Sequence, residues 1–312
     1  MLDILRELVE IESPSGNEEK VKEYVKDYLN DAGFKARTDE AGNLFLRGES
    51  DLWFVTHLDT VEKISDFRFD EEFAYGTGVA DAKGSIAAIL HAITSFDDLG
   101  INLAFLVDEE EGGSGSKLFA KEFSGRAVVM EPTELKTASK QLGSAEVILK
   151  FEGRAVHGAY FEKGTNAVEK AIDEISKLKA KYTFSIQEFA GGCNLYAVPD
   201  RCRVRLSFIF DSEVGIDSVK DELSMLDAEF EFFDFYEPIE CDTIEEIERY
   251  SKGRIVMRSW TDAYHFKKCG WKVTVWGPGN LEECHTEREK ISIKEIQEAS
   301  KIIESVNREV MS

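Results

Sequence analysis

Cysteine is scarce in this chain of 312 residues, which has five cysteines and none before Cys193. No two of them are spaced as C-x-x-C. The sequence therefore argues against a disulfide framework and against a zinc site built on thiolates. Few, irregularly spaced cysteines are typical of a cytoplasmic protein with reduced thiols, and we expect that location.

Basic side chains are also in the minority. Lysine and arginine total 38, aspartate and glutamate total 61, and the formal net charge is −23. Phosphates and anionic lipid headgroups are bound by basic surfaces, so this balance argues against nucleic-acid and membrane partners. The chain also lacks the run of about 18 uncharged apolar residues that spans a membrane. Its first residues, 1–12, are acidic and helical in pattern, unlike a signal peptide.

Hydrophobic residues nevertheless make up 43% of the chain, which is enough for a packed core. Apolar residues at helical spacing predict four helices, over residues 2–12, 18–32, 85–96 and 291–310. Short continuous apolar runs predict buried parallel strands over residues 52–56, 103–107, 127–130 and 272–276. Helices that alternate with such strands indicate an α/β fold with a mostly parallel sheet.

Polar residues that can bind a metal follow each of these apolar runs. His57 ends the first run, four carboxylates at 108–111 follow the second, and Glu131 ends the third. His285 comes after the Gly-Pro-Gly turn that follows the fourth run. Because ligands bind outside the carboxyl ends of parallel strands, we expect these side chains to meet at one edge of the sheet.

Each motif has an ordinary explanation when it is taken alone. His57-Leu58-Asp59 fits a loop histidine, and the carboxylates at 108–111 fit a solvated acidic loop. Asp81, within the glycine-rich segment 76–84, fits a helix N-cap. A phosphate-binding loop does not fit that segment, because it lacks the G-x-x-x-x-G-K-S/T pattern and its aspartate would repel phosphate.

Together the motifs fit two divalent cations. Two histidines and three carboxylates suffice if Asp81 bridges the ions. Each ion then has one histidine, one terminal carboxylate and the shared aspartate. The charge also balances, since three carboxylates and one hydroxide offset two cations. Nitrogen and oxygen ligands without thiolate suit zinc, cobalt or manganese. One glutamate of 108–111 is then free to act as general base towards a metal-bound water.

The ordered motifs H-L-D-T, G-T-G-V-A-D-A-K-G, D-E-E-E-G-G, E-P-T and H-x-x-x-E resemble those of the co-catalytic zinc peptidase family. Its members include acetylornithine deacetylase, succinyl-diaminopimelate desuccinylase, glutamate carboxypeptidases and carrier-linked lysine/ornithine hydrolases. The resemblance extends from Ser13-Pro14-Ser15-Gly16 to the last predicted helix.

This resemblance implies roles for individual residues. His57, Asp81 and Glu131 would hold one metal ion, and Asp81, Glu110 and His285 would hold the other. Asp59 would orient His57, and Glu109 would be the general base. Because a third glutamate, Glu111, follows Glu109 and Glu110, the family motif can also be aligned one residue later in the sequence, and this alternative stays open. The family also implies a cis peptide bond between Asp81 and Ala82.

A different pattern occupies residues 144–236, where strand-like and helical stretches follow one another in the order βαββαβ. We expect an inserted ferredoxin-like α+β domain there, between catalytic parts at 1–143 and 237–312. The resemblance implies that this domain is a lid and dimerisation module, through which two copies would pair. It also implies that His157, in G-R-A-V-H-G, stabilises the oxyanion of the reaction. One alternative is that His157 does so in the active site of the partner subunit.

The inserted domain departs from the family pattern at its substrate-binding positions. Asn194 comes two residues earlier than the family's asparagine, and the strand after Pro199 lacks an acidic-x-arginine pair. Arg201, Arg203 and Arg205 would share one face of that strand. They are candidates to bind an anionic substrate or a small acidic carrier protein, and pairing with acidic neighbours is the alternative.

The family resemblance implies a metal-dependent hydrolase that cleaves the amide of an N-acyl or carrier-linked amino acid. Acetylornithine, succinyl-diaminopimelate and N-linked lysine are examples. A di- or tripeptidase or a carboxypeptidase is the first alternative, and a metal-free scaffold protein is the second. Two zinc ions per chain are the expected cofactors, with cobalt or manganese as alternatives.

Overall fold

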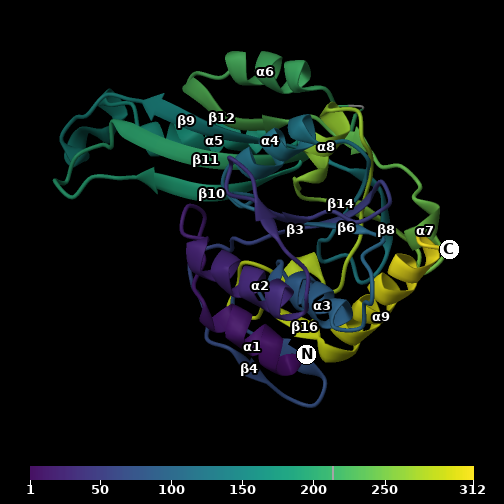
Figure 1. The fold of residues 1–312 in the computed structure, drawn as a ribbon. Coiled ribbons are helices and arrows are strands. Elements are labelled where there is room, and N and C mark those ends of the chain that lie inside the picture. The colour runs from purple at the N-terminus through teal and green to yellow at the C-terminus, as the bar shows by residue number, and fades with distance from the viewer. Residues whose placement is uncertain (213) are drawn as a thin grey trace. The chain divides into compact units, whose positions relative to one another are not determined.

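The computed structural model describes residues 1–212 and 214–312. The chain divides into two compact units. The first contains residues 1–140, 240–257 and 261–312, and the second contains residues 141–239 and 258–260. We describe each unit by itself (Figure 1).

A six-stranded sheet forms the centre of the first unit, in the order β1-β2-β6-β3-β7-β15. β6, β3, β7 and β15 run parallel to one another, whereas β1 pairs with β2, and β2 with β6, in the antiparallel sense. The strands are β1 (Arg37–Thr38), β2 (Leu44–Leu46), β3 (Leu52–His57), β6 (Asn102–Leu106), β7 (Arg126–Val129) and β15 (Lys272–Val275). The four predicted parallel strands are confirmed, and the sheet is mostly parallel.

Both faces of this sheet are covered, which explains why its strands are continuous apolar runs. Neighbouring residues of a strand point to opposite faces. Accordingly, Trp53 contacts Phe119 and Trp271, with ring centroids 5.1 and 6.2 Å away, whereas Phe54 contacts Trp276 at 6.4 Å. All six residues of β3 are buried.

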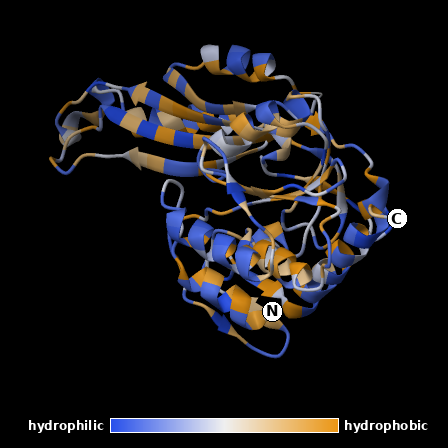
Figure 2. Cartoon of the chain, viewed as in Figure 1, coloured by the Kyte–Doolittle hydropathy of each residue, from blue (hydrophilic) through white to orange (hydrophobic). Residues whose placement is uncertain are grey.

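Helices supply the two covering layers (Figure 1). α1, α2, α3 and α9 lie together on one face of the sheet, and α4 and α8 lie on the other. Figure 2 shows that α1, α2 and α9 carry both apolar and hydrophilic residues, as helices between a core and solvent do, whereas α3 is buried at every position except His91. The predicted helices are confirmed. The helices are α1 (Leu2–Glu10), α2 (Glu19–Asp31), α3 (Lys83–Ile93), α4 (Ser114–Glu122), α7 (Glu245–Glu248), α8 (Ala263–Lys268), the 3₁₀ turn η2 (Leu281–Glu283) and α9 (Ile293–Glu309).

Two three-stranded sheets were not predicted from the sequence. They have the orders β13-β8-β14 and β16-β5-β4. Most of their strands are too short to show a clear alternation of apolar and polar residues. The strands are β4 (Arg68–Phe69), β5 (Phe73–Tyr75), β8 (Thr137–Gln141), β13 (Ile239–Glu240), β14 (Arg254–Met257) and β16 (Lys290–Ser292).

The second unit has the element order β9-α5-β10-β11-α6-β12, with the 3₁₀ turn η1 (Gly158–Lys163) after β9. Its antiparallel sheet has the order β10-β11-β9-β12. Alternate residues of β9 and β11 pack with α5 and α6 into one apolar core. This is the predicted ferredoxin-like α+β arrangement. The elements are β9 (Gly143–Glu152), α5 (Ala167–Lys179), β10 (Phe184–Gly191), β11 (Arg201–Phe210), α6 (Ile216–Ser224) and β12 (Glu229–Tyr236).

None of the helices in the described part of the chain is both long enough and apolar enough to cross a bilayer.

Candidate metal centre

The candidate ligands of the first unit follow adjacent strands of the central sheet. His57 is the last residue of β3, Glu110 follows β6, and Glu131 follows β7. β6, β3 and β7 are neighbours in the sheet, so their carboxyl ends lie side by side. Asp81 comes just before α3, and His285 comes after β15 and η2. The fold thereby brings together residues as far apart in the sequence as His57 and His285.

The first triad consists of His57, Asp81 and Glu131, all of which are buried. One ligand atom of each lies within 4.8 Å of the other two. His57 Nε2 is 3.1 Å from Asp81 Oδ1 and 4.0 Å from Glu131 Oε1. Glu131 Oε1 has no hydrogen-bond partner among the described residues. A buried carboxylate oxygen without a partner is costly and calls for a ligand.

The second triad consists of Asp81, Glu110 and His285, and one ligand atom of each again lies within 4.8 Å of the other two. His285 Nε2 is 3.1 Å from Glu110 Oε2 and 3.5 Å from Asp81 Oδ2. The two oxygens of Asp81 therefore face different histidines, His57 and His285. His285 is half exposed, so this side of the pair of triads is open to solvent.

The imidazole of His57 is oriented by the residue two positions later. Its Nδ1 lies 2.9 Å from the backbone oxygen of Asp59, to which it donates as N–H. The other nitrogen, Nε2, is then free of its proton in the neutral ring and points at the triad. The carboxylate of Asp59 is farther from Nδ1, at 3.5 Å.

The carboxylate of Asp59 binds mainly to backbone groups of the loop after β6. Its Oδ1 accepts the N–H of Glu109 at 3.1 Å, and its Oδ2 accepts the N–H of Glu110 at 2.9 Å. The hydroxyl of Ser15 also donates to Oδ2, at 2.7 Å. Asp59 is fully buried. It therefore fixes the backbone of both predicted functional glutamates.

Glycine is required where the segment before Asp81 passes close to its neighbours. Gly78 has φ +77°, and a Cβ there would lie 2.4 Å from Thr60 Cγ2. Gly277, which lies outside that segment, is a second such position, because a Cβ there would lie 2.7 Å from the backbone oxygen of Glu131.

The peptide bond between Asp81 and Ala82 is cis, as the family resemblance implied.

Burial and mutual repulsion change the proton affinities of the carboxyl groups. Burial raises the pKa of Glu109 and Glu131 well above the usual range, and neighbouring carboxylates raise both further. Burial also raises the pKa of Glu110. Asp81 behaves differently, because the hydrogen bonds from both histidines outweigh its burial and lower its pKa.

The pKa values of both histidines are raised, although burial by itself lowers the pKa of an imidazole. Burial alone would lower the pKa of His57, but hydrogen bonds with Asp59 and Asp81 raise it well above its usual value. Hydrogen bonds with Asp81 and Glu110 raise the pKa of His285 to about 10. Both imidazoles therefore experience strong negative potential from the surrounding carboxylates.

These observations fit divalent cations held by the chain. Several carboxylates lie buried beside one another with only two histidines among them, and repulsion between them disfavours their ionised forms. Cations would remove this repulsion and would give Glu131 Oε1 a partner. The donors are imidazole nitrogens and carboxylate oxygens, a set that binds zinc and related divalent ions.

Asp262 is a buried residue near the triads that the sequence analysis missed. It is 1% exposed and comes just before α8, and its Oδ1 has no partner among the described residues. Burial and the charges of Asp59 and Asp108 raise its pKa to about 7, although a hydrogen bond with Ser116 and the charge of His57 oppose the shift. A lone aspartate before a short helix gives no sign of such a position, because it is typical of a helix N-cap.

The second unit contains the other predicted residues, His157, Asn194 and the three arginines. His157 and Asn194 are exposed, and the ring centroid of His157 is 5.4 Å from that of Tyr196. No interaction is found for Asn194 among the described residues.

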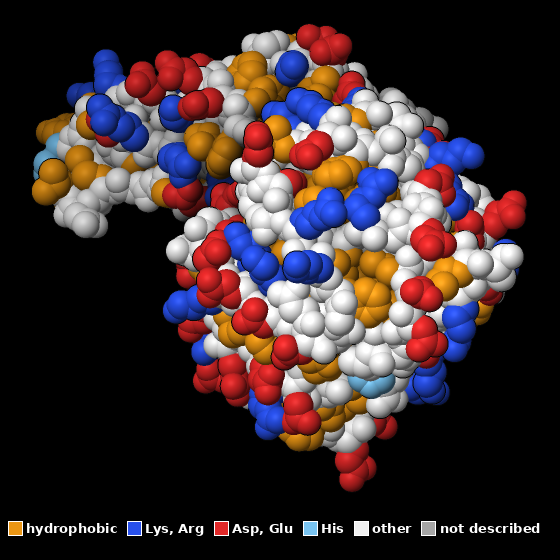
Figure 3. Space-filling model, viewed as in Figure 1, with side chains coloured by type: hydrophobic (Ala, Val, Ile, Leu, Met, Phe, Trp, Pro, Cys, Tyr) orange, Lys and Arg blue, Asp and Glu red, His pale blue; other side chains and the backbone are white. Residues whose placement is uncertain are grey.

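The arginines lie on one face of β11, as the sequence predicted, but two of them are already paired. Arg203 pairs with Glu188, and Arg205 pairs with Glu146 and stacks on Phe233. Figure 3 shows acidic and basic side chains interspersed over the visible surface. This pairing is the alternative that the sequence analysis left open, and it leaves Arg201 as the exposed arginine of the three.

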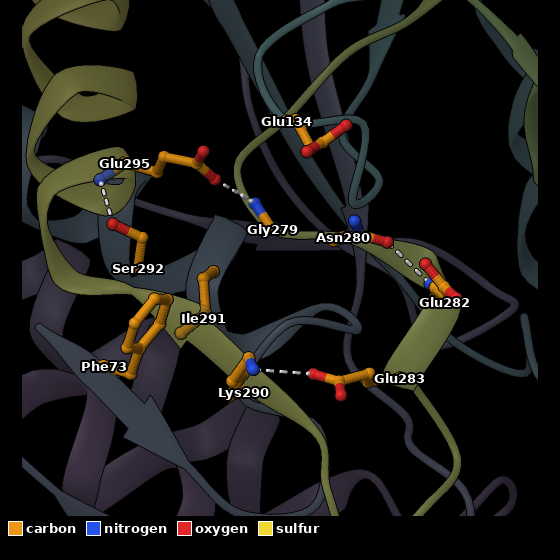
Figure 4. A pocket seen from close by; sticks show the side chains of 10 residues that line it. All are labelled: Phe73, Glu134, Gly279, Asn280, Glu282, Glu283, Lys290, Ile291, Ser292 and Glu295. Atoms are coloured by element: carbon orange, nitrogen blue, oxygen red, sulfur yellow. Dashed lines mark hydrogen bonds and ion pairs between the residues drawn. The ribbon is translucent and has the colours of Figure 1, made fainter.

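A cavity of about 360 Å³ is lined in part by residues 279–280 and 282–283, before His285, and by residues 290–292 and Glu295, after it (Figure 4). No member of either triad lines it. Its glutamates are largely engaged: Glu283 pairs with Lys290 at 3.1 Å, and Glu295 accepts the N–H of Gly279 at 2.9 Å. The candidate chemistry is therefore at the two triads and not in this cavity.

Comparison with known proteins identifies the family. The sequence profile of peptidase family M20/M25/M40 matches residues 53–309. The chain belongs to this family. It is therefore an amide-bond hydrolase of the M20 group, whose divalent metals fit the two triads described above.

Relatives of this M20 chain are found at low identity over nearly its whole length. A LysW-lysine/LysW-ornithine hydrolase of Sulfurisphaera tokodaii is 26% identical and covers 94% of this chain and 91% of its own length. A protein of Methanocaldococcus jannaschii described as an uncharacterized metallohydrolase is also 26% identical, with 98% and 96% covered.

Solved structures support the M20 fold. A tripeptidase from Staphylococcus aureus matches with a TM-score of 0.82 at 21% identity, covering 99% of this chain and 97% of that one. An M20 metallo-carboxypeptidase from Sulfolobus solfataricus matches with a TM-score of 0.78 at 17% identity, covering 99% and 98%. The predicted fold class is thus confirmed.

Proposed function

We propose that this M20 chain is a dinuclear metal-dependent hydrolase that cleaves the amide bond of an N-acyl or N-linked amino acid. His57, Asp81 and Glu131 would hold one divalent ion, and Asp81, Glu110 and His285 would hold the other. The observation that carries the proposal is the pair of triads that share Asp81, each within 4.8 Å. Zinc is our first choice of metal, with cobalt and manganese as alternatives.

When bound, such ions polarise a substrate carbonyl and lower the pKa of water. We infer that Glu109 moves the proton in this reaction. Its backbone is fixed by Asp59, and its side chain is buried. Burial and its acidic neighbours give the carboxylate a higher proton affinity than an exposed glutamate has. Glu109 would accept a proton from the attacking water and return it to the leaving amine.

The names of two relatives support our proposal for the substrate class. The hydrolase of Sulfurisphaera tokodaii is named for lysine and ornithine linked to LysW, and a Pyrococcus abyssi relative carries the same name as a putative one. We infer that this chain acts on lysine or ornithine joined through an amide, either to a small acidic carrier protein or to a simple acyl group.

A di- or tripeptidase activity is the alternative, favoured by the similarity to the Staphylococcus aureus tripeptidase. The two functions differ in the group on the acyl side of the scissile bond. The peptidase would accept free dipeptides and tripeptides, whereas the deacylase would require an acyl or carrier group.

A substrate panel with the zinc-loaded chain separates these functions. It would contain N-acetylornithine, N-succinyl-diaminopimelate, carrier-linked lysine and simple dipeptides, with Glu109→Gln as the inactive control. We expect hydrolysis of at least one N-acyl or carrier-linked substrate. Hydrolysis of the dipeptides alone would replace our proposal by the alternative, and no hydrolysis of any substrate would contradict both.

We also propose that the second unit serves as a lid and pairs two copies of the chain. Phe161, Leu195 and Tyr196 support this, since they are apolar or aromatic and are 72%, 84% and 72% exposed. Sedimentation analysis should give a dimer for the native chain and a larger monomer fraction for Leu195→Glu. A monomer in the native chain would contradict the pairing.

A further inference from the structure

Glu289 holds the segment that presents Asp81. Glu289 lies between η2 and β16 and is 1% exposed. Its Oε2 accepts the N–H of Gly78 at 3.1 Å, and its Oε1 accepts the N–H groups of Ala80 at 3.0 Å and Asp81 at 3.3 Å. One carboxylate therefore binds three donors more than 200 positions away in the chain.

These three amides need a partner from outside their own segment. The segment forms only a few internal backbone bonds, such as Val79 N–H to Gly76 oxygen at 3.2 Å and Lys83 N–H to Gly78 oxygen at 2.9 Å. Gly78, Ala80 and Asp81 are buried. Buried N–H groups without an acceptor cost free energy, so the segment depends on the Glu289 carboxylate for its conformation.

Glu289 also connects the segment that carries His285 with the segment that carries Asp81. Glu289 follows His285 by four residues in one short segment, and it binds the backbone N–H of Asp81 directly. Its own backbone oxygen accepts the N–H of Gly76 at 3.4 Å. The segments that carry His285 and Asp81 are thus attached to each other through Glu289.

We propose that Glu289 is a positioning residue that sets the Asp81 carboxylate between His57 and His285, so that Asp81 can bridge two divalent ions. This inference rests on the proposed two-ion site. Because Asp81 belongs to both triads, loss of Glu289 weakens the binding of both ions and not of one alone.

Glu289→Gln tests the proposal with little change of shape. Glutamine keeps one acceptor oxygen. Its NH₂ group replaces the second oxygen, so a donor faces a backbone N–H that has lost its acceptor. Glu283→Gln is the matched control. It removes the same charge from the same part of the chain. Glu283, however, pairs with Lys290 in the lining of the cavity (Figure 4), and among the described residues no bond joins it to the Asp81 segment.

The first measurement uses the metal-free chain and does not depend on catalysis. Hydrogen exchange of the Gly78, Ala80 and Asp81 amides should be slow in the native chain and in Glu283→Gln, and faster in Glu289→Gln. The second measurement is Co²⁺ titration, followed by calorimetry and by the visible absorption of the bound ion. We expect about 10- to 100-fold weaker binding of both ions to Glu289→Gln, as is typical when a group that orients a ligand is lost.

The outcomes separate this inference from the proposed function. Native-like Co²⁺ affinity and spectrum in Glu289→Gln would overturn the positioning role. Failure of the native chain to bind Co²⁺ would overturn the two-ion site, and the positioning role with it, while the exchange rates would still test the three hydrogen bonds. If Glu289→Gln does not fold, the Co²⁺ affinity of Glu289→Asp tests the positioning role instead. Its shorter carboxylate should also weaken Co²⁺ binding, and native affinity in that variant would overturn the proposal.

Discussion

The carboxylate of Asp59 accepts the backbone N–H of Glu110 at 2.9 Å. This bond joins the residues after β3 to the loop after β6, two parallel strands that pair in register as far as His57 and Leu106. Asp59 orients His57 through its backbone oxygen and fixes Glu109 and Glu110 through its side chain. The two functions of this residue can therefore be separated by mutation.

Asp59→Asn should preserve the orientation of His57, because the backbone oxygen that accepts the imidazole N–H is unchanged. It should disturb the backbone of Glu109 and Glu110, since the amide has one acceptor oxygen instead of two. We expect about 10- to 100-fold lower kcat, with the second ion lost more readily than the first. Steady-state kinetics and metal analysis check this. Native kcat would show that the bonds to the loop are unimportant.

Glu109→Gln should retain metal and lose turnover. Glutamine is close in shape but cannot take a proton, so we expect kcat to fall by about 10² or more. Glu111→Gln is the control, because Glu111 is exposed and lies next in the sequence. Near-native turnover of Glu109→Gln, together with loss in Glu111→Gln, would move the general base to Glu111.

Metal binding should weaken as the pH falls. In the ion-free chain the pKa of His285 is raised to about 10 and that of His57 is raised well above its usual value. A raised pKa keeps the imidazole protonated at neutral pH, and a protonated imidazole cannot bind a metal, so binding must release protons. The raised pKa of Glu131 acts in the same direction.

Zinc titrations at pH 6 and pH 8, each in two buffers of different ionisation enthalpy, measure this proton release. We expect net release at both values and tighter binding at pH 8. Affinity that is independent of pH, or net proton uptake, would contradict the assignment of the histidines as ligands.

His157→Ala tests the oxyanion role that the family resemblance implies for this residue. Loss of one oxyanion donor costs about 10²- to 10³-fold in kcat, and we expect a fall in that range with a small change in KM. Tyr160→Phe is a control from the 3₁₀ turn that His157 caps. Equal effects of the two variants, or a native kcat for His157→Ala, would show that His157 has no such role.

The central strands could be predicted because residues such as Trp53 and Phe54 are both apolar and cover opposite faces. The order of the strands in the sheet could not, because periodicity says which faces are buried and not which strands are neighbours. The five candidate ligands could be named because each follows an apolar run or lies in a motif of the family.

Residues that act through buried contacts could not be predicted in the same way. Asp262 has no motif around it that separates it from a helix cap. Glu289 was part of the H-x-x-x-E motif, but its three bonds to the Asp81 segment depend on a contact more than 200 residues away. The binding of the Asp59 carboxylate to the loop after β6 likewise appears only once β3 and β6 are paired.

Metal analysis of the purified chain tests the central claim most directly. After incubation with zinc and removal of free ions, we predict about two zinc ions per chain in the native protein, as a two-metal site requires. Asp81→Ala, which removes the residue shared by both triads, should lose both ions. A native chain that retains one ion or none would contradict the account.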